Sequence, residues 1–195
     1  MAFRLRYITN PRHAAAVKAV AEKAQWQARP YPNPNRGKGE LMTGRGVSYT
    51  ERAGTIVAVI AEVEVERASG RVWAKKFTVA HDCGLIINPG SMQVVIEGNV
   101  LQATSRTLFE EVRFDADRVN SVDWATYPIL DIADAPESVD VVLINRTEIA
   151  PSGAGEPSTR TVPAAIANAI FDATGVRLRK VPLTPQRMKE ALARA

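Results

Sequence analysis

The sequence of 195 residues predicts an α+β fold, a hairpin-rich mixed sheet covered by helices. Two periodicities predict it. Residues 59–66 and 72–80 are apolar, partly alternating runs on either side of a short polar turn, which is typical of an antiparallel hairpin. Residues 11–25, 89–112 and 163–174 repeat apolar side chains at the spacing of one helix face. Because sheets and helices both bury an apolar face, these segments should pack in layers on a shared core.

The first predicted helix begins at Asn10-Pro11 and ends near Gln25. Asparagine accepts a hydrogen bond from an unpaired N–H at a helix start, and the fixed φ of proline suits the next position. Apolar residues then recur along one face, at Val17, Val20, Ala21 and Ala24. Residues 29–46 are rich in proline and glycine, so we interpret them as a linker between two units of the chain.

The predicted hairpin carries charge on its outer face. Glutamates alternate with valines in residues 59–66, the turn is Ala68–Arg71, and the returning strand carries Lys75 and Lys76. Acidic residues that face lysines on paired strands suit a solvent-exposed surface. We therefore interpret this charge pattern as a contribution to solubility and not as a site.

The second half of the chain repeats the helix signals. Asn88-Pro89 begins a helix that ends near Val112, and a glycine within it, Gly98, costs about 1 kcal/mol relative to alanine. Such a glycine indicates either a molecule bound against the helix or a closely crossing strand. The segments that follow are a short strand at 139–144, the helix at 163–174 with a terminal glycine at 175, and a last helix from Thr184-Pro185.

The loop Pro151–Pro157 carries a single carboxylate, Glu156, between a glycine and a proline. The glycines allow another group to approach closely, and Pro157 biases Glu156 toward an extended backbone. A carboxylate held in this way suits a general base. The same pattern also fits an ordinary structural turn.

Composition argues against several classes of function. The net charge is +4, but the basic residues are scattered and lack interleaved aromatics, so we expect no nucleic-acid partner. No apolar run is long enough to cross a bilayer. One cysteine and two histidines are fewer than the four Cys and His ligands of a usual structural zinc site, so we expect no such site. His81, Asp82 and Cys83 are adjacent on a strand, where neighbours point to opposite faces, so we expect no metal there and a buried Cys83. We expect Trp26, Trp73 and Trp124 to be packing residues.

Two ordered blocks resemble the molybdenum hydroxylases, the family of xanthine dehydrogenase and aldehyde oxidase. The first block comprises His81–Gly84, Asn88-Pro89 and Ile96–Gln102. The second comprises Gly155-Glu156-Pro157 and the segments 162–175 and 177–183. The resemblance runs from about residue 10 to about residue 185 and is closest to the large subunits of the isoquinoline 1-oxidoreductase and nicotinate dehydrogenase type.

The resemblance implies the C-terminal part of a molybdopterin-binding large subunit. Residues 1–28 would be a helix continuing an absent upstream region, 29–46 the linker, and 47–195 a portion of the molybdopterin-binding domain. The implied partners are the missing part of the large subunit or a chain supplying it, an iron–sulfur small subunit with 2Fe–2S clusters, and a second copy in a homodimer. The implied location is the cytoplasm, or the periplasm for the full assembly.

The resemblance also implies the chemistry. Glu156 would be the general base in hydroxylating an aldehyde or an N-heterocycle, with water as the oxygen source, and the role requires its burial beside the cofactor. That cofactor would be molybdenum–molybdopterin in the cytosine dinucleotide form. The residues near it would be Gly155, Gly153, Gly98 and Gln102. Without the upstream region we expect the isolated chain to be inactive. The alternative is a non-catalytic docking module or a truncated remnant.

Two positions depart from the family pattern. Val95 stands where many members carry a glutamine, so a hydrogen bond to the cofactor is either missing or made by Gln93 or Gln102. Arg160 stands where many relatives have small or apolar residues. It either pairs with an anionic group or faces solvent.

Overall fold

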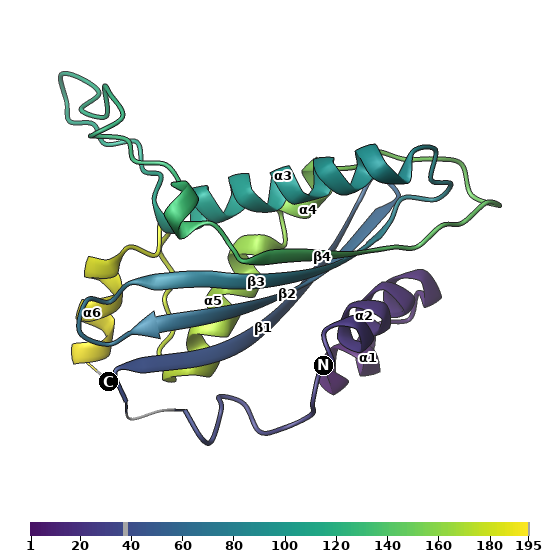
Figure 1. The fold of residues 1–195 in the computed structure, drawn as a ribbon, viewed down its shortest axis with the longest axis horizontal. Helices are drawn as coiled ribbons and strands as arrows, with labels where there is room; N and C mark the ends of the chain where they lie inside the picture. The colour runs from purple at the N-terminus through teal and green to yellow at the C-terminus, as the bar shows by residue number, and fades with distance from the viewer. Residues whose placement is uncertain (37–38, 195) are drawn as a thin grey trace.

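A four-stranded mixed sheet forms the centre of the structure, which is a computed structural model describing residues 1–36 and 39–194 (Figure 1). The strands are β1 (Leu41–Arg52), β2 (Thr55–Glu66), β3 (Val72–Asp82) and β4 (Ser138–Leu143), in that spatial order. The first three strands pair antiparallel, and β4 pairs parallel with β3. The predicted α+β fold with a hairpin-rich mixed sheet is confirmed.

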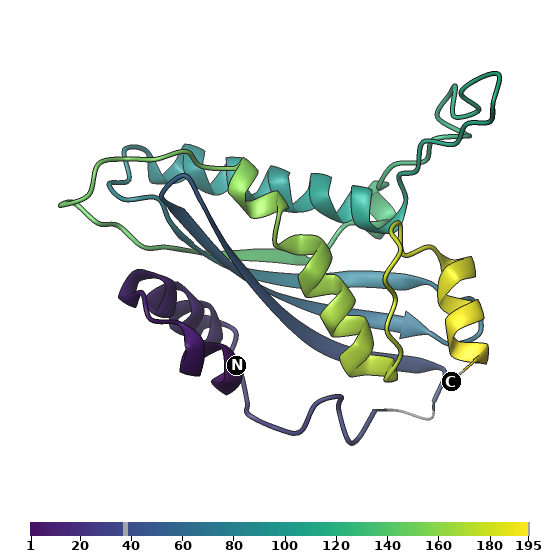
Figure 2. The same cartoon turned by 180° about the vertical axis from the view of Figure 1, so that it is seen from behind.

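Helices cover both faces of this sheet. They are α1 (Ala2–Tyr7), α2 (Pro11–Lys23), α3 (Pro89–Leu108), α4 (Glu156–Thr159), α5 (Val162–Thr174) and α6 (Pro185–Ala193), with a 3-10 turn, η1, at Ile132–Asp134. The apolar face of α2 packs on one side of β2 and β3. Helices α3 and α5 pack on the other side, as the view from behind shows (Figure 2). The alternation of strand residues thus supplies two separate apolar cores.

The predicted helix starts are confirmed by their caps. Asn10 accepts a hydrogen bond from the backbone N–H of Arg12 at 2.9 Å, and Asn88 accepts one from Ser91 at 3.0 Å. A proline follows each cap. Helix α5 ends in a left-handed glycine at position 175, as predicted. Helices α2 and α3 end a few residues before their predicted ends, at Lys23 and Leu108.

Strand β1 begins inside the segment predicted as a linker. Gly44 and Gly46 contributed to that prediction, but they lie in the strand, where a Cβ on either would collide with the backbone of α5. These glycines therefore let the helix lie directly against the strand. The irregular region before β1 is residues 24–40 without 37 and 38, which lie outside the described residues. The division of the chain into two units there stays a prediction.

Residues 110–134 form an arm that projects away from the sheet between α3 and β4 (Figure 1). Trp124 lies in this arm with 78% of its surface exposed, so the prediction that it is a packing residue is wrong. Trp26 and Trp73 are partly buried, and the indole N–H of Trp73 donates to the carbonyl of Ala135 at 3.0 Å. Among the helices of the described residues, none is long and apolar enough to cross a membrane.

Candidate active site

Glu156 lies at the surface as the first residue of the short helix α4. The expectation of an extended backbone there is wrong, because a proline in the first helical turn needs no N–H donor and Pro157 occupies that position. The Glu156 side chain is 65% exposed, and its carboxylate accepts a hydrogen bond from the guanidinium of Arg52, at the end of β1. In this chain alone, the burial that the general-base role requires is absent.

Gly155 places the loop directly against helix α3. Its φ is +88°, and a Cβ there would lie 2.5 Å from Cγ1 of Val95 and 2.9 Å from Nδ2 of Asn99. Both the positive φ and the lack of space favour glycine at this position. The close approach that the sequence predicted is made here by α3 itself. Val95, the departure from the family pattern, therefore contacts the loop that carries Glu156.

The loop is anchored on two further sides. The hydroxyl of Thr55, at the start of β2, donates to the carbonyl of Gly153 at 2.6 Å. The backbone N–H of Ser152 donates to the carbonyl of Cys83 at 2.8 Å, and the hydroxyl of Ser152 donates to the same carbonyl at 3.0 Å. The start of β2, the end of β3 and the helix α3 thus fix the position of the loop before Glu156.

The other predicted site residues lie on α3. Gly98 is exposed, and a Cβ on it would meet nothing within 4 Å, so the alternative of a closely crossing strand is wrong. Gln102 is one turn further along and is exposed. Because positions 95, 98 and 102 share a helix face, Gly98 and Gln102 continue the surface that begins at Val95 beside the loop. Gln93 is engaged within the helix, where its amide donates to Glu97 at 2.8 Å.

Asp82 is the centre of a buried ion-pair cluster at the end of β3, next to the segments that anchor the loop. Asp82 is 0% exposed, with Arg12 Nη2 2.6 Å from Oδ1 and Arg146 Nε 2.7 Å from Oδ2. Burial alone would raise the pKa of Asp82, but hydrogen bonds from the two arginines and from the N–H of Gly84 outweigh it and lower that pKa. The cluster joins α2, the end of β3 and the segment after β4 that leads to the Glu156 loop.

His81 and Cys83 are buried on either side of Asp82. Neither ring nitrogen of His81 has a hydrogen-bond partner among the described residues, and burial lowers its pKa to about 4. The imidazole is therefore neutral at ordinary pH. Cys83 is buried, as predicted, with its sulfur 3.8 Å from that of Met92. The described residues contain no cluster of three or more His, Cys, Asp or Glu that could hold a metal.

The site fits a pterin and phosphate group in part. Gly98 and Gly153 leave open space beside the backbone, and Arg52 and Gln102 offer a guanidinium and an amide that suit anionic and carbonyl oxygens. Arg160, the second departure from the family pattern, is also exposed, which agrees with a solvent-facing position. Sequence reasoning missed Arg52, Thr55 and Asn99, because their contacts with the loop join segments far apart in the chain.

Comparison with known proteins identifies the family. Residues 6–136 match the family described as the molybdopterin cofactor-binding domain. The chain is 39% identical over 198 residues to one of the subunits of nicotinate dehydrogenase from Pseudomonas putida, covering 97% of this chain and 17% of that protein. It is 30% identical over 184 residues to the beta chain of isoquinoline 1-oxidoreductase from Brevundimonas diminuta, covering 94% of this chain and 22% of that protein. The chain thus spans about a fifth of the length of these relatives.

Solved structures agree. The fold matches quinoline 2-oxidoreductase from Pseudomonas putida 86 with a TM-score of 0.65 and 27% identity, over 71% of this chain and 19% of that one. It matches the aldehyde oxidoreductase from Desulfovibrio gigas with a TM-score of 0.64 and 29% identity, over 71% and 15% of the two chains. The chain belongs to the molybdopterin cofactor-binding domains of the xanthine dehydrogenase and aldehyde oxidase family, the molybdenum hydroxylases.

Proposed function

We propose that this chain is the C-terminal part of a molybdenum hydroxylase that oxidises an aldehyde or an N-heterocycle, with Glu156 as the general base and water as the oxygen source. The observation that carries the proposal is the position of the Gly155-Glu156-Pro157 loop. It lies against the half of α3 that carries Gly98, so two sequence blocks that resemble the family meet at one surface.

Other residues of this chain would hold and orient the carboxylate of Glu156, which would accept the proton. Gly155 sets the direction in which the backbone enters α4, and Arg52 steadies the carboxylate of Glu156 from the side. Gly98, Gln102 and Gly153 would border the molybdopterin, for which we propose the cytosine dinucleotide form. When bound, this cofactor supplies the redox centre that accepts the electrons of the oxidation.

The exposure of Glu156 supports a requirement for further protein. A general base works best when its surroundings exclude water and tune its proton affinity, and this chain leaves most of the carboxylate in solvent. We therefore propose that the isolated chain is inactive and that an upstream part of the large subunit, or a chain supplying it, covers the site. An iron–sulfur subunit with 2Fe–2S clusters would carry the electrons away. The nicotinate dehydrogenase and isoquinoline 1-oxidoreductase relatives are each named as one subunit of an enzyme, which supports a multisubunit assembly.

The test is Glu156→Gln in the complete assembly, purified from its own source. Glutamine keeps the size of the side chain and removes its capacity to take a proton. We expect the variant to retain its molybdenum, measured by elemental analysis, and to lose at least about a hundredfold in turnover. The control is Glu190→Gln, which neutralises an exposed glutamate on α6, far from the loop in the sequence.

The same experiment separates the enzyme from the alternative. Turnover of Glu156→Gln close to that of the unmodified assembly would contradict the general-base assignment. Absence of molybdenum and of any companion chain in the purified unmodified protein would instead favour a non-catalytic docking module or a truncated remnant. The exposed apolar side chains of the arm are the observation that favours docking.

A further inference from the structure

Two arginines lie close to the carboxylate of Glu156. Arg52 is at the end of β1, and its Nη1 donates to Oε1 of Glu156. Arg160 follows α4 with a helical backbone, so positions 156 and 160 are about one turn apart and share a face. Among the contacts that the described residues make, the side chain of Arg160 has no hydrogen bond or ion pair. Two guanidinium groups thus accompany one carboxylate, which leaves an excess of positive charge.

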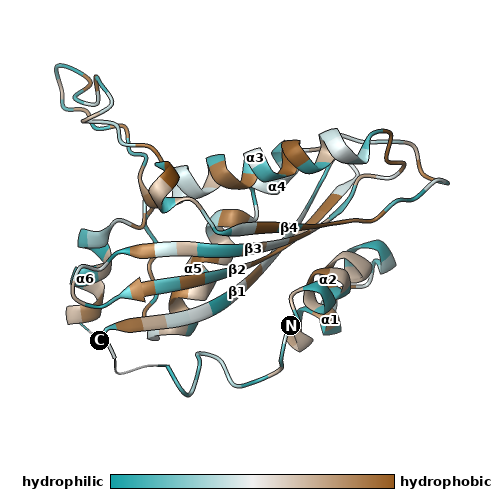
Figure 3. Ribbon diagram, viewed as in Figure 1, coloured by the Kyte–Doolittle hydropathy of each residue, from teal (hydrophilic) through white to brown (hydrophobic). Residues whose placement is uncertain are grey.

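The turn between β1 and β2 fixes the position of Arg52. Arg52 pairs with Thr55 across the hairpin, so the two side chains lie on the same face of the sheet. The hydroxyl of Thr55 donates to the carbonyl of Gly153 at 2.6 Å, which joins the turn to the loop. The carbonyl of Gly54, within the turn, accepts a hydrogen bond of 3.2 Å from Arg12. This turn is at the opposite end of β2 from the turn that contacts α6 (Figure 3).

The guanidinium of Arg52 retains donors for a second anion. A guanidinium has five N–H groups in a planar fork that matches the two oxygens of a carboxylate. Within the described part of the chain, the Arg52 side chain donates through Nη1 alone, to Glu156, and 39% of its surface is exposed. An exposed ion pair contributes little to the free energy of folding, so a ligand can rearrange this pair with little loss of stability.

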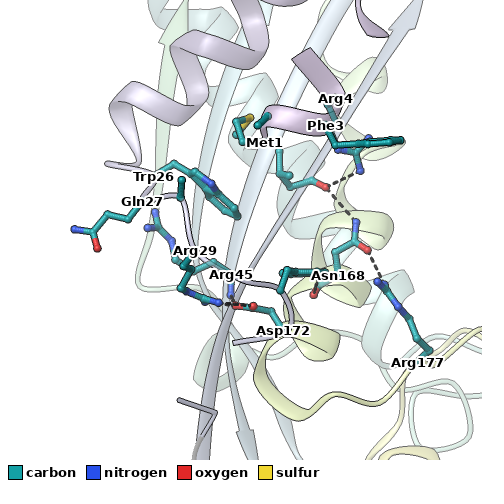
Figure 4. A pocket seen from close by; sticks show the side chains of 14 residues that line it. Met1, Phe3, Arg4, Trp26, Gln27, Arg29, Arg45, Asn168, Asp172 and Arg177 are labelled. Carbon is teal, nitrogen blue, oxygen red and sulfur yellow. Dashed lines mark hydrogen bonds and ion pairs between the residues drawn. The ribbon is translucent and has the colours of Figure 1, made fainter. Parts of the chain in front are cut away.

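Arginines elsewhere in the fold are engaged within the chain. A cavity of about 650 Å³ lies between α1, the segment after α2, β1 and α5 (Figure 4). In its lining, Arg29 pairs with Asp172 at 2.5 Å. Arg177 donates to Asn168 at 2.9 Å. Both contacts join α5 to a neighbouring segment, so these arginines serve the packing of the fold. Among the described residues that line this cavity, Glu156 does not occur, so the surroundings of Glu156 are a separate place.

We propose that Arg52 and Arg160 recognise a carboxylate on the substrate and so select aldehydes or N-heterocycles that carry an acid group. This inference rests on the proposed function, in which the substrate lies against Glu156. An anion held by arginines beside the general base therefore belongs to the molecule that reacts there. One further carboxylate balances the local charge, with two guanidinium groups against two carboxylates. Hydrogen bonds from a guanidinium fork also fix the orientation of the substrate relative to Glu156.

The test is the binding of benzoate and benzamide to the complete assembly, purified from its own source and studied by titration calorimetry. The two probes have the same ring and nearly the same size, but only benzoate is charged. Neither probe carries an aldehyde or a ring nitrogen. We expect the unmodified assembly to bind benzoate at least about tenfold more tightly than benzamide, because hydrogen bonds to a charged group are the stronger ones. In the double variant Arg52→Gln, Arg160→Gln, the two dissociation constants should agree within about twofold, with that of benzamide unchanged.

The matched control is Arg194→Gln on α6. Arg194 is an exposed arginine paired with a glutamate, Glu190, at the other end of the sheet from Glu156. The control should keep the full preference for benzoate. Arg52→Lys keeps the positive charge but loses the planar fork, so it should keep a smaller preference than the unmodified assembly.

Molybdenum content separates a substrate carboxylate from a cofactor phosphate as the anion at this place. Arginines that held a phosphate of the cofactor would release molybdenum when replaced, whereas we expect the double variant to retain it. Equal affinities for the two probes in the unmodified assembly, a preference that persists in the double variant, or loss of molybdenum from that variant would each overturn the proposal.

Glu156→Gln separates this inference from the general-base assignment. The variant keeps both arginines, so it should lose turnover and still prefer benzoate. If turnover persisted while the preference still depended on the two arginines, the general-base assignment alone would fail. If turnover were lost while the double variant kept its preference, the carboxylate site alone would fail.

Discussion

Asp82→Asn is expected to lower the free energy of unfolding by about 3 kcal/mol. The Asp82 carboxylate is fully buried, and it pairs with Arg12 from α2 and with Arg146 from the segment after β4. Asparagine has nearly the same volume, but it carries no charge and can turn an N–H₂ group toward a guanidinium. The substitution therefore leaves two cations without a counter-ion while the packing around the side chain stays intact.

The magnitude follows from the burial of each partner. Removing one member of a buried ion pair costs about 3–5 kcal/mol, because the remaining charge is left desolvated. Both arginine side chains keep 25% of their surface exposed, so they recover part of their hydration. That places the expected cost at the lower end of the range.

The assay is equilibrium unfolding in urea at one protein concentration. With an m value of about 2 kcal/mol/M, a loss of about 3 kcal/mol lowers the midpoint by about 1.5 M. The control is Asp140→Asn, where Lys76 lies 2.9 Å away and both side chains are partly exposed, so the loss should stay below about 1 kcal/mol. If Asp82→Asn cost no more than this control, the cluster would not be the anchor we infer.

The remaining predictions concern the pH dependence of stability, through His81, and the effect of two glycine substitutions on stability. The pKa of His81 is about 4 in the folded chain and about 6.5 in the unfolded chain. As the pH falls from 6.5 to 4, the unfolded state therefore binds a proton that the folded state does not bind. Stability is complete above pH 6.5 and should be about 2 kcal/mol lower at pH 5. The loss should shrink in His81→Leu, and an unchanged difference in urea midpoint between pH 7 and pH 5 would contradict the assignment. Gly98→Ala should stabilise the chain by about 1 kcal/mol, since it adds a helix former in open space. Gly155→Ala should destabilise it, because φ is positive and Val95 and Asn99 occupy the space. Thermal unfolding of the two variants should therefore move in opposite directions, and a shift in the same direction would contradict the placement of the loop.

Local signals predicted the elements whose ends are set by short-range chemistry. The Asn-Pro caps of α2 and α3 and the glycine after α5 depend on hydrogen bonds within a few residues, so they can be read from the chain itself. Strand β1 could not be read in the same way. Gly44 and Gly46 weaken a strand pattern, and only the contact with α5, more than a hundred residues later, explains why they are there.

The same distinction between short-range and long-range contacts applies to the candidate site. The loop with Glu156 and the helix with Gly98 were both predicted from the sequence, but their mutual contact through Val95, Asn99 and Gly155 was not. The helical start of α4 and the exposure of Glu156 were missed as well, because burial depends on the whole fold. Trp124 was missed for a related reason, since an apolar residue type favours a core only when the chain supplies a surface to cover it.

The contrast between a fixed loop and an exposed carboxylate favours a functional role for Glu156. A loop that serves only as a turn needs few partners, yet this one is held by Thr55, by the end of β3 through Cys83, and by α3 through Gly155. Fixing a backbone costs conformational entropy, which these contacts offset. The side chain at the end of the loop nevertheless contributes little to the core, because most of it faces solvent. Precise placement of an exposed carboxylate is expected when its partner is another molecule. The substitution Glu156→Gln in the complete assembly tests whether the Glu156 carboxylate has such a partner.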